Sequence, residues 1–147
     1  MNTENNKTVI FIIKKNMAAG RYSFTIEQGT TVNFEIQYKD SNGNPINLAG
    51  YAGKMMIRSN FADDSPTTYI TLSSSLNPDG TGLNFSGSNG TTPPTSGSIG
   101  IYISSCTSSL LNFNTALYDL EIYSGSNCPY TIRLLEGQVR LSQEVTR

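Results

Sequence analysis

The stretch Val32-Asn33-Phe34-Glu35-Ile36-Gln37-Tyr38-Lys39 places apolar and polar residues in strict alternation. Successive side chains of a β-strand point to opposite faces, so this pattern predicts a strand that buries one face and exposes the other. A turn cluster from Asp40 to Pro45 follows at once. It contains Asn-Gly, which accepts a positive φ at low cost, and Pro45 restarts the chain in an extended conformation.

Similar segments recur along the chain, and turn residues separate them. The strands we expect cover residues 8–14, 22–26, 32–38, 51–58, 69–72, 83–86, 99–103, 117–123, 130–135 and 138–141. The last two form either a strand pair or one strand with a bulge at Gly137. One helical turn is expected at 107–111, with Thr107 or Ser108 as its cap. Without the short segment at 83–86, the expected segments make eight or nine strands, and with almost no helix they predict an all-β sandwich or barrel.

Residues 73–98 are low in complexity and rich in Ser, Gly and Asn. A loop of this length without structure is uncommon in a compact domain. We therefore expect a short strand around 83–86 and a mobile tip at 87–97.

The composition restricts what the chain can do. Its 18 Ser, 16 Thr and 15 Asn make up a third of the 147 residues, charged residues make up 14%, and the net charge is −1. Because the chain has no His, an imidazole base, a His-ligated metal and a Ser-His-Asp triad are excluded. The balanced charge attracts neither a phosphate backbone nor an anionic membrane, so we expect no nucleic-acid and no membrane binding.

The carboxylates form no recognisable catalytic pair. Asp63-Asp64 lies in a loop with nothing to desolvate it. Asp119 and Glu121 share one face of a strand, and we expect them at its solvent side, opposite Arg133 or Arg140. The sequence therefore predicts no enzymatic activity and no catalytic residue.

No cofactor or metal site is expected either. Asp79-Gly80 is interpreted as a plain turn, because the spacing of a calcium loop is absent. Cys106 and Cys128 are expected to be reduced, small and partly buried, although their spacing leaves a disulfide open.

The apolar run from Val9 to Ile13 is the feature with the sharpest functional meaning. It is too short for a spanning helix of about 20 residues or for a signal-peptide core, so the chain is expected to be cytosolic when made. It either forms the first strand of its own sandwich or adds to a sheet of a neighbouring subunit. The residues of this candidate intersubunit strand are Val9, Ile10, Phe11, Ile12 and Ile13.

The aromatic residues divide into two groups. Those on strand faces with apolar companions are expected in the core: Tyr22, Phe24, Phe34, Tyr38 and Tyr118. The candidate exposed contact aromatics are Tyr69, Tyr102 and Tyr123. Together with the many Asn residues, exposed Tyr residues leave a host-glycan-binding module as an alternative function.

Six short segments follow one another along the chain: Phe24-Thr25-Ile26-Glu27-Gln28-Gly29, Tyr38 to Pro45, Leu48 to Tyr51, Tyr118-Asp119-Leu120-Glu121-Ile122, Arg133-Leu134-Leu135-Glu136-Gly137 and Glu144 to Arg147. In this order they resemble small structural proteins of tailed bacteriophages and, more loosely, the amino-terminal domain of upper baseplate proteins of siphophages. The similarity covers roughly residues 22–147, and none of the phrases is catalytic.

The resemblance implies an immunoglobulin-like β-sandwich that serves as a part of the virion, assembled in the host cytoplasm. Residues 1–21 would form an extension or arm, and residues 22–147 a single domain with a long loop at 73–98. The implied role is a tail or baseplate component or adaptor. Its partners would be other phage structural proteins and copies of itself. A capsid decoration or neck protein is the structural alternative.

Overall fold

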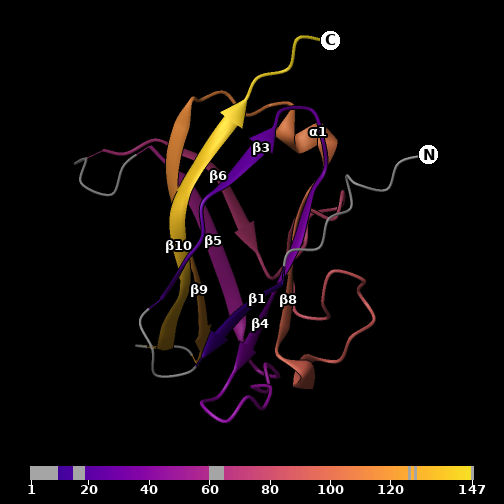
Figure 1. Cartoon of the computed structure of the whole chain (residues 1–147), viewed down its shortest axis with the longest axis vertical. Coiled ribbons are helices and arrows are strands. Elements are labelled where there is room, and N and C mark those ends of the chain that lie inside the picture. Colours follow the sequence, from indigo (N-terminus) through magenta and orange to yellow (C-terminus); the bar gives the residue numbers. More distant parts are fainter. Residues whose placement is uncertain (1–9, 15–18, 60–64, 126, 128, 147) are drawn as a thin grey trace.

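The structure is a computed structural model that describes residues 10–14, 19–59, 65–125, 127 and 129–146. Two β-sheets pack face to face around one hydrophobic core, with β10 and β8 on opposite sides of the view in Figure 1. The prediction of an all-β sandwich is thereby confirmed.

The first sheet, called sheet A, has four strands. In spatial order they are β1 (Ile10–Lys14), β4 (Val32–Lys39), β8 (Ser98–Ile103) and β7 (Gly82–Asn84). β1 and β4 run parallel, whereas β4, β8 and β7 are antiparallel neighbours. In β4 the alternate residues are buried and those between them are half-buried, as the pattern of the sequence predicts.

The second sheet, sheet B, is larger. Its strands are β2 (Gly20–Arg21), β3 (Phe24–Glu27), β10 (Tyr130–Ser142), β9 (Thr115–Ser124), β5 (Ala52–Arg58) and β6 (Thr68–Ser73). β2 and β3 follow one another along the same edge of β10, and both run parallel to it. The other neighbours in the order β10-β9-β5-β6 are antiparallel.

The strand order supports the immunoglobulin-like topology that the resemblance implies. β4, β8 and β7 take the order of strands B, E and D, and β10, β9, β5 and β6 that of G, F, C and C′. The parallel pairings of β1 with β4, and of β2 and β3 with β10, depart from two purely antiparallel sheets.

Tyr118 of β9 is completely buried and belongs to the hydrophobic core between the sheets. Its hydroxyl donates a hydrogen bond of 2.5 Å to the carbonyl oxygen of Tyr22, which connects β2 and β3. The rings of Phe24 and Tyr118 lie 5.2 Å apart, and Phe24 contacts Phe34 of sheet A at the same distance. This aromatic cluster therefore joins both sheets to the short edge strands, and the core assignment of these residues is confirmed.

Residues 130–142 form one continuous strand, which confirms the second of the two predicted alternatives. The predicted position of the bulge at Gly137 is wrong, because the register shifts between Arg133 and Leu135. Leu134 and Leu135 are both buried around this irregularity. Gly137 has a different role: a Cβ there would overlap the carbonyl oxygen of Tyr22. The absence of a side chain at Gly137 allows the backbone between β2 and β3 to approach β10 closely.

The helical turn lies earlier than predicted. Helix α1 spans Ser105–Ser108, and its N-cap is Ser104 rather than Thr107 or Ser108. The side chain of Ser104 accepts a hydrogen bond from the backbone N–H of Thr107, which satisfies one of the free donors of the first turn. The sequence does not indicate Ser104 as the cap, because it directly follows the apolar residues of β8 and a polar residue there also fits the end of a strand.

The segment between β7 and β8 carries a 3-10 turn, η2 (Pro94–Ser96), and lies on the outer side of β8, at the right of Figure 1. The strand expected at 83–86 corresponds to β7, which ends earlier than predicted, at Asn84. Glu35 of β4 anchors the segment: its Oε1 accepts hydrogen bonds from the backbone N–H and the hydroxyl of Ser88, at 2.9 and 3.2 Å.

Cys106 is an exposed free thiol, so the expectation of a partly buried cysteine is wrong at this position. It lies in the four-residue helix α1, where Ser105 is also exposed and Ser108 is buried. Cys128 lies outside the described residues.

We expect Tyr118→Phe to lower the free energy of unfolding by about 1 kcal/mol, because the part-buried hydrogen bond from its hydroxyl to the carbonyl oxygen of Tyr22 is lost. Chemical denaturation followed by circular dichroism measures the loss. Tyr38→Phe is the matched control: Tyr38 is equally buried, and its hydroxyl makes no hydrogen bond to the described residues, so its loss should stay below about 0.5 kcal/mol. Equal losses in the two variants would contradict the role of Tyr118.

Candidate functional site

Strand β1 contains the described part of the candidate intersubunit strand. Ile10 to Ile13 pair in register with Glu35 to Tyr38 of β4, and Val9 lies outside the described residues. Within the described part of the chain, no strand pairs with the other edge of β1. Ile12 is 54% exposed beside this edge, in register with Gln37. The segment is thus a strand of its own sheet and also presents a free edge.

The other sheet edges are blunted in ways that natural proteins use against unwanted pairing. β7 has three residues, β2 two and β3 four. β6 is longer, but it presents the exposed Thr68 and Thr71. Among the described edge strands, only β1 exposes a large aliphatic side chain, that of Ile12.

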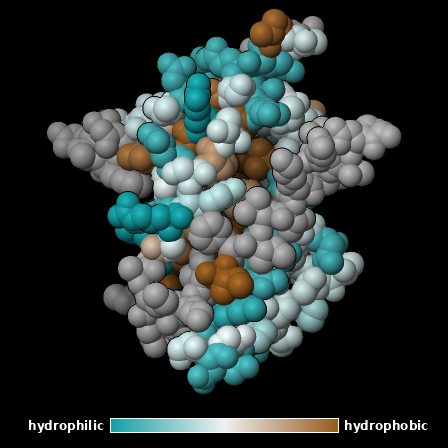
Figure 2. Space-filling model, viewed as in Figure 1, coloured by the Kyte–Doolittle hydropathy of each residue, from teal (hydrophilic) through white to brown (hydrophobic). Residues whose placement is uncertain are grey.

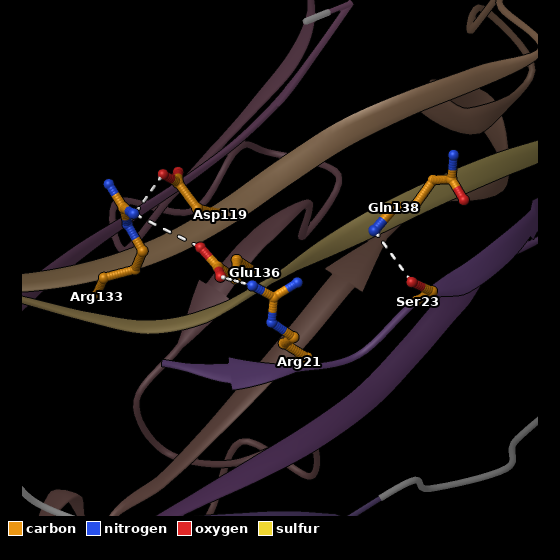
Figure 3. A network of polar contacts seen from close by, with 6 residues as sticks. All are labelled: Arg21, Ser23, Asp119, Arg133, Glu136 and Gln138. Carbon is orange, nitrogen blue, oxygen red and sulfur yellow. Dashed lines mark hydrogen bonds and ion pairs between the residues drawn. The ribbon is translucent and has the colours of Figure 1, made fainter. Parts of the chain in front are cut away.

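The outer face of sheet B carries a network of ion pairs (Figure 3). Nε of Arg133 lies 3.4 Å from Asp119 and 3.8 Å from Glu121, which confirms the predicted pairing across the β9–β10 ladder. Glu136 lies 3.5 Å from both Arg133 and Arg21, so the network reaches β2. These side chains are partly solvated, and each pair contributes little to stability. The carboxylates are occupied by structural pairs.

The outer face of sheet A is different, because it carries a pocket of about 300 Å³. Its floor is built from two rungs of paired residues across β4, β8 and β7. Asn33 pairs with Tyr102, which pairs with Gly82, and in the next rung Gly100 pairs with Asn84. The loop at 87–90 closes the pocket on its other side.

Glycines make this arrangement possible. A Cβ at Gly100 would lie 2.8 Å from the backbone of Gly87 and Ser88, so a larger residue in β8 would push the loop away. A Cβ at Gly80 would lie 3.3 Å from the ring of Tyr102. The loop and the turn therefore pack directly against the sheet, on either side of the space that they leave.

The three candidate contact aromatics lie at separate places. Tyr69 of β6 stacks on Phe113 with ring centroids 4.7 Å apart and packs against the core. Tyr123 of β9 lies in register with Ala52 and Thr131 in sheet B, and Tyr102 lines the pocket on sheet A. All three are half-buried, and no common surface joins them.

Asp79, interpreted from the sequence as part of a plain turn, is the centre of a polar network at the rim of the pocket. Its Oδ2 accepts hydrogen bonds from Ser104 and Thr107, at 2.5 and 2.6 Å, and its Oδ1 accepts one from the N–H of Thr81 at 3.0 Å. These bonds hold the pKa of Asp79 well below its usual range, the bond from Ser104 having the largest effect. Nothing in the local sequence indicated the contact, since Ser104 lies 25 residues away.

A second polar network ties α1 to the turn after β3 and to the C-terminal segment. Gln28 donates to the carbonyl oxygen of Leu111 at 2.8 Å, and its side-chain oxygen accepts from the N–H of Glu144 at 2.8 Å. Ser108 donates to the carbonyl oxygen of Thr30 and accepts from the N–H of Gly29. Because every one of these groups is satisfied within the chain, the network is structural.

The described residues contain no group of three or more Cys, Asp or Glu side chains that could hold a metal ion. In the same part of the chain, no helix is long and apolar enough to cross a membrane.

No family model matches the chain, and no curated protein matches it. Among solved structures, the N-terminal domain of phage TP901-1 ORF48 is similar, with a TM-score of 0.47 and 8% sequence identity over 90% of this chain and 95% of that chain.

The Asp79 network predicts a dependence of stability on pH. The folded state lowers the pKa of Asp79 below its ordinary value of 3.8, so the stability that the ionised group contributes is complete above that value and is lost as the pH falls further. Asp79→Asn should therefore lower the melting temperature at pH 7, and the difference from the wild type should shrink below about pH 4. Thermal denaturation between pH 2 and pH 7 measures it, and a difference that stays constant with pH would contradict the prediction.

Proposed function

We propose that this chain is a structural component of a tailed-bacteriophage particle, in its tail or baseplate, where it binds neighbouring subunits and has no catalytic activity. The observation that carries the proposal is the apolar strand β1, one edge of which pairs with no strand in the described part of the chain. Unpaired N–H and C=O groups along such an edge are ready to accept a further strand.

The positions of the phage-like phrases support the proposal. The sequence segments 24–29, 118–122 and 133–137 lie in or next to β3, β9 and β10, which are neighbours in sheet B. Residues 38–45 form the end of β4 and the turn after it. The resemblance therefore covers the framework of the sandwich, as expected of a family whose shared property is a fold for assembly.

The surface supports binding through a few anchors. Figure 2 shows mostly hydrophilic and neutral residues on the displayed face, with separate apolar patches. The exposed large hydrophobic residues of the described chain are Ile12, Leu76, Leu110, Tyr130 and Val145. Interfaces derive most of their binding energy from such isolated aliphatic and aromatic residues. The small net charge of −1 is consistent with contacts that do not depend on salt.

The partners would be copies of this chain and other proteins of the particle. In strand addition, main-chain hydrogen bonds supply affinity, and the side chains on the two faces of the added strand supply specificity. Ile12 is the described side chain of β1 that would meet such a partner.

Particle composition tests the proposal. We expect the protein in purified phage particles and, after heads and tails are separated, in the tail fraction, where antibody labelling locates it. Labelling of the capsid or neck would overturn the tail position and favour the structural alternative. A protein that is abundant in infected cells and absent from purified particles would overturn the proposal itself.

A charge at the edge tests the role of β1. We expect Ile12→Lys to reduce incorporation into particles about tenfold, because a lysine on an edge strand opposes the addition of another strand. Thr71→Lys in β6 is the matched control, since it places the same charge at an exposed position of the opposite sheet's edge. Both variants should keep the melting temperature of the wild type. Equal incorporation of the two would contradict strand addition at β1.

A further inference from the structure

We propose that the pocket on the outer face of sheet A binds a single neutral sugar residue. The pocket, of about 300 Å³, lies at the lower end of the range of small-molecule sites. Its lining comes from three strands and two loops: Asn33, Asn84 and Tyr102 from the sheet, Asp79 from the turn before β7, and Ser88 and Asn89 from the loop after it. The inference does not depend on the role of the chain in a phage particle.

Three asparagine side chains in the pocket have hydrogen-bonding groups to offer. Asn84 and Asn89 use their oxygens within the loop: Asn84 accepts from the N–H of Ser86, and Asn89 accepts from Thr91 and Thr92. Their NH₂ groups, and the whole amide of Asn33, make no hydrogen bond to the described residues. An amide donates two hydrogen bonds and accepts at its oxygen, which matches adjacent hydroxyl groups that both donate and accept.

Tyr102 supplies an apolar surface with a polar tip. Its side chain is half-buried, it lies beside Asn33 in the same rung, and Gly80 packs against its ring. Its hydroxyl makes no hydrogen bond within the described residues. An aromatic ring next to amide groups suits a pyranose, which has an apolar face of C–H groups and a polar rim.

The charge of the pocket selects against anions. No Lys or Arg lines it, and its one acidic group, Asp79, directs both oxygens to Ser104, Thr107 and Thr81. A phosphate would therefore find no cation and would meet the negative charge of Asp79. A neutral polyhydroxylated ligand fits the remaining groups better than a nucleotide or a phosphorylated compound does.

The walls of the pocket are held in place before any ligand binds. Glu35 bonds Ser88 twice, and Gly100 lets the loop backbone rest on β8. The Oδ1 of Asn84 fixes the start of the same loop through Ser86. A preformed site loses less conformational freedom on binding, which favours even a small ligand.

Titration of ¹⁵N-labelled protein with free sugars tests the proposal directly, because the side-chain NH₂ signals of Asn33, Asn84 and Asn89 report on the pocket itself. The probes are glucose, galactose, mannose, rhamnose and N-acetylglucosamine, with glycerol and uridine monophosphate for comparison. We expect saturable shifts of these signals with at least one sugar, with a dissociation constant on the order of 1 mM.

Asn33→Ala is the sharpest variant, because the Asn33 side chain holds nothing else in place. It should weaken sugar binding about tenfold without changing the melting temperature. Asn114→Ala is the matched control, since Asn114 is an exposed asparagine that does not line the pocket, and it should bind as the wild type does. Tyr102→Phe keeps the ring and removes only the hydroxyl, so it should bind more weakly while the fold is preserved.

Three outcomes would overturn the proposal: no saturable shift with any of the five sugars, shifts with uridine monophosphate or glycerol that equal those with the sugars, or sugar binding that survives Asn33→Ala unchanged. Loss of binding in Asn33→Ala but not in Asn114→Ala supports it. Because the readout is the isolated chain in solution, the result is separate from any test of particle incorporation.

Discussion

The contact on which the rest of the structure depends is the one between Tyr118 and the backbone of Tyr22. The Tyr118 ring is buried between the sheets, and its hydroxyl donates to a carbonyl that Gly137 allows to approach β10. Burial raises the pKa of Tyr118, and Tyr22 adds to this effect, so the hydroxyl keeps its proton and donates at neutral pH. The bond places β2 and β3 on the edge of sheet B.

That placement determines where β4 begins. The chain leaves β3 through the turn at Gln28 and Gly29, which is tied to α1 and to the segment after β10. It then enters β4, whose Phe34 contacts Phe24 and Tyr22 across the interface between the sheets. The two sheets are therefore joined by aromatic packing at one end of the sandwich, and the position of each outer face follows from it.

The outer faces of the two sheets differ because their side chains differ in size. On sheet B, long charged side chains pair with one another across β9, β10 and β2, which leaves a flat polar surface. On sheet A, Gly100 has no side chain above the strand, so the loop at 87–90 rests on β8 and closes one side of the pocket. A recess forms there in which the NH₂ groups of Asn33, Asn84 and Asn89 have no partner among the described residues. No described strand pairs with the other edge of β1 in the same sheet.

Much of the fold could be predicted because it depends on local alternation. The apolar positions of β4, β5 and β9 are buried as predicted, and the pairing of Arg133 with Asp119 and Glu121 follows from strands joined by a short hairpin turn. The predictions that are wrong concern residues whose role depends on a contact with a residue far away in the sequence. Ser104 caps α1 and also donates a hydrogen bond to Asp79. Gly137 leaves room for the carbonyl oxygen of Tyr22 at the edge of the sheet. Such roles leave no trace in the neighbouring sequence.

The sequence by itself determined the class of fold, the alternation of buried and exposed faces, and the chemistries that a chain without histidine cannot perform. It also identified Tyr102 and the abundance of Asn, without any indication that Asn33, Asn84 and Asn89 would meet beside that ring. Only the tertiary structure decided this, because the pairing of β4, β8 and β7 brings together residues from distant parts of the chain. Periodicity reports which face of a strand a residue occupies, whereas its neighbours on that face depend on the register with other strands.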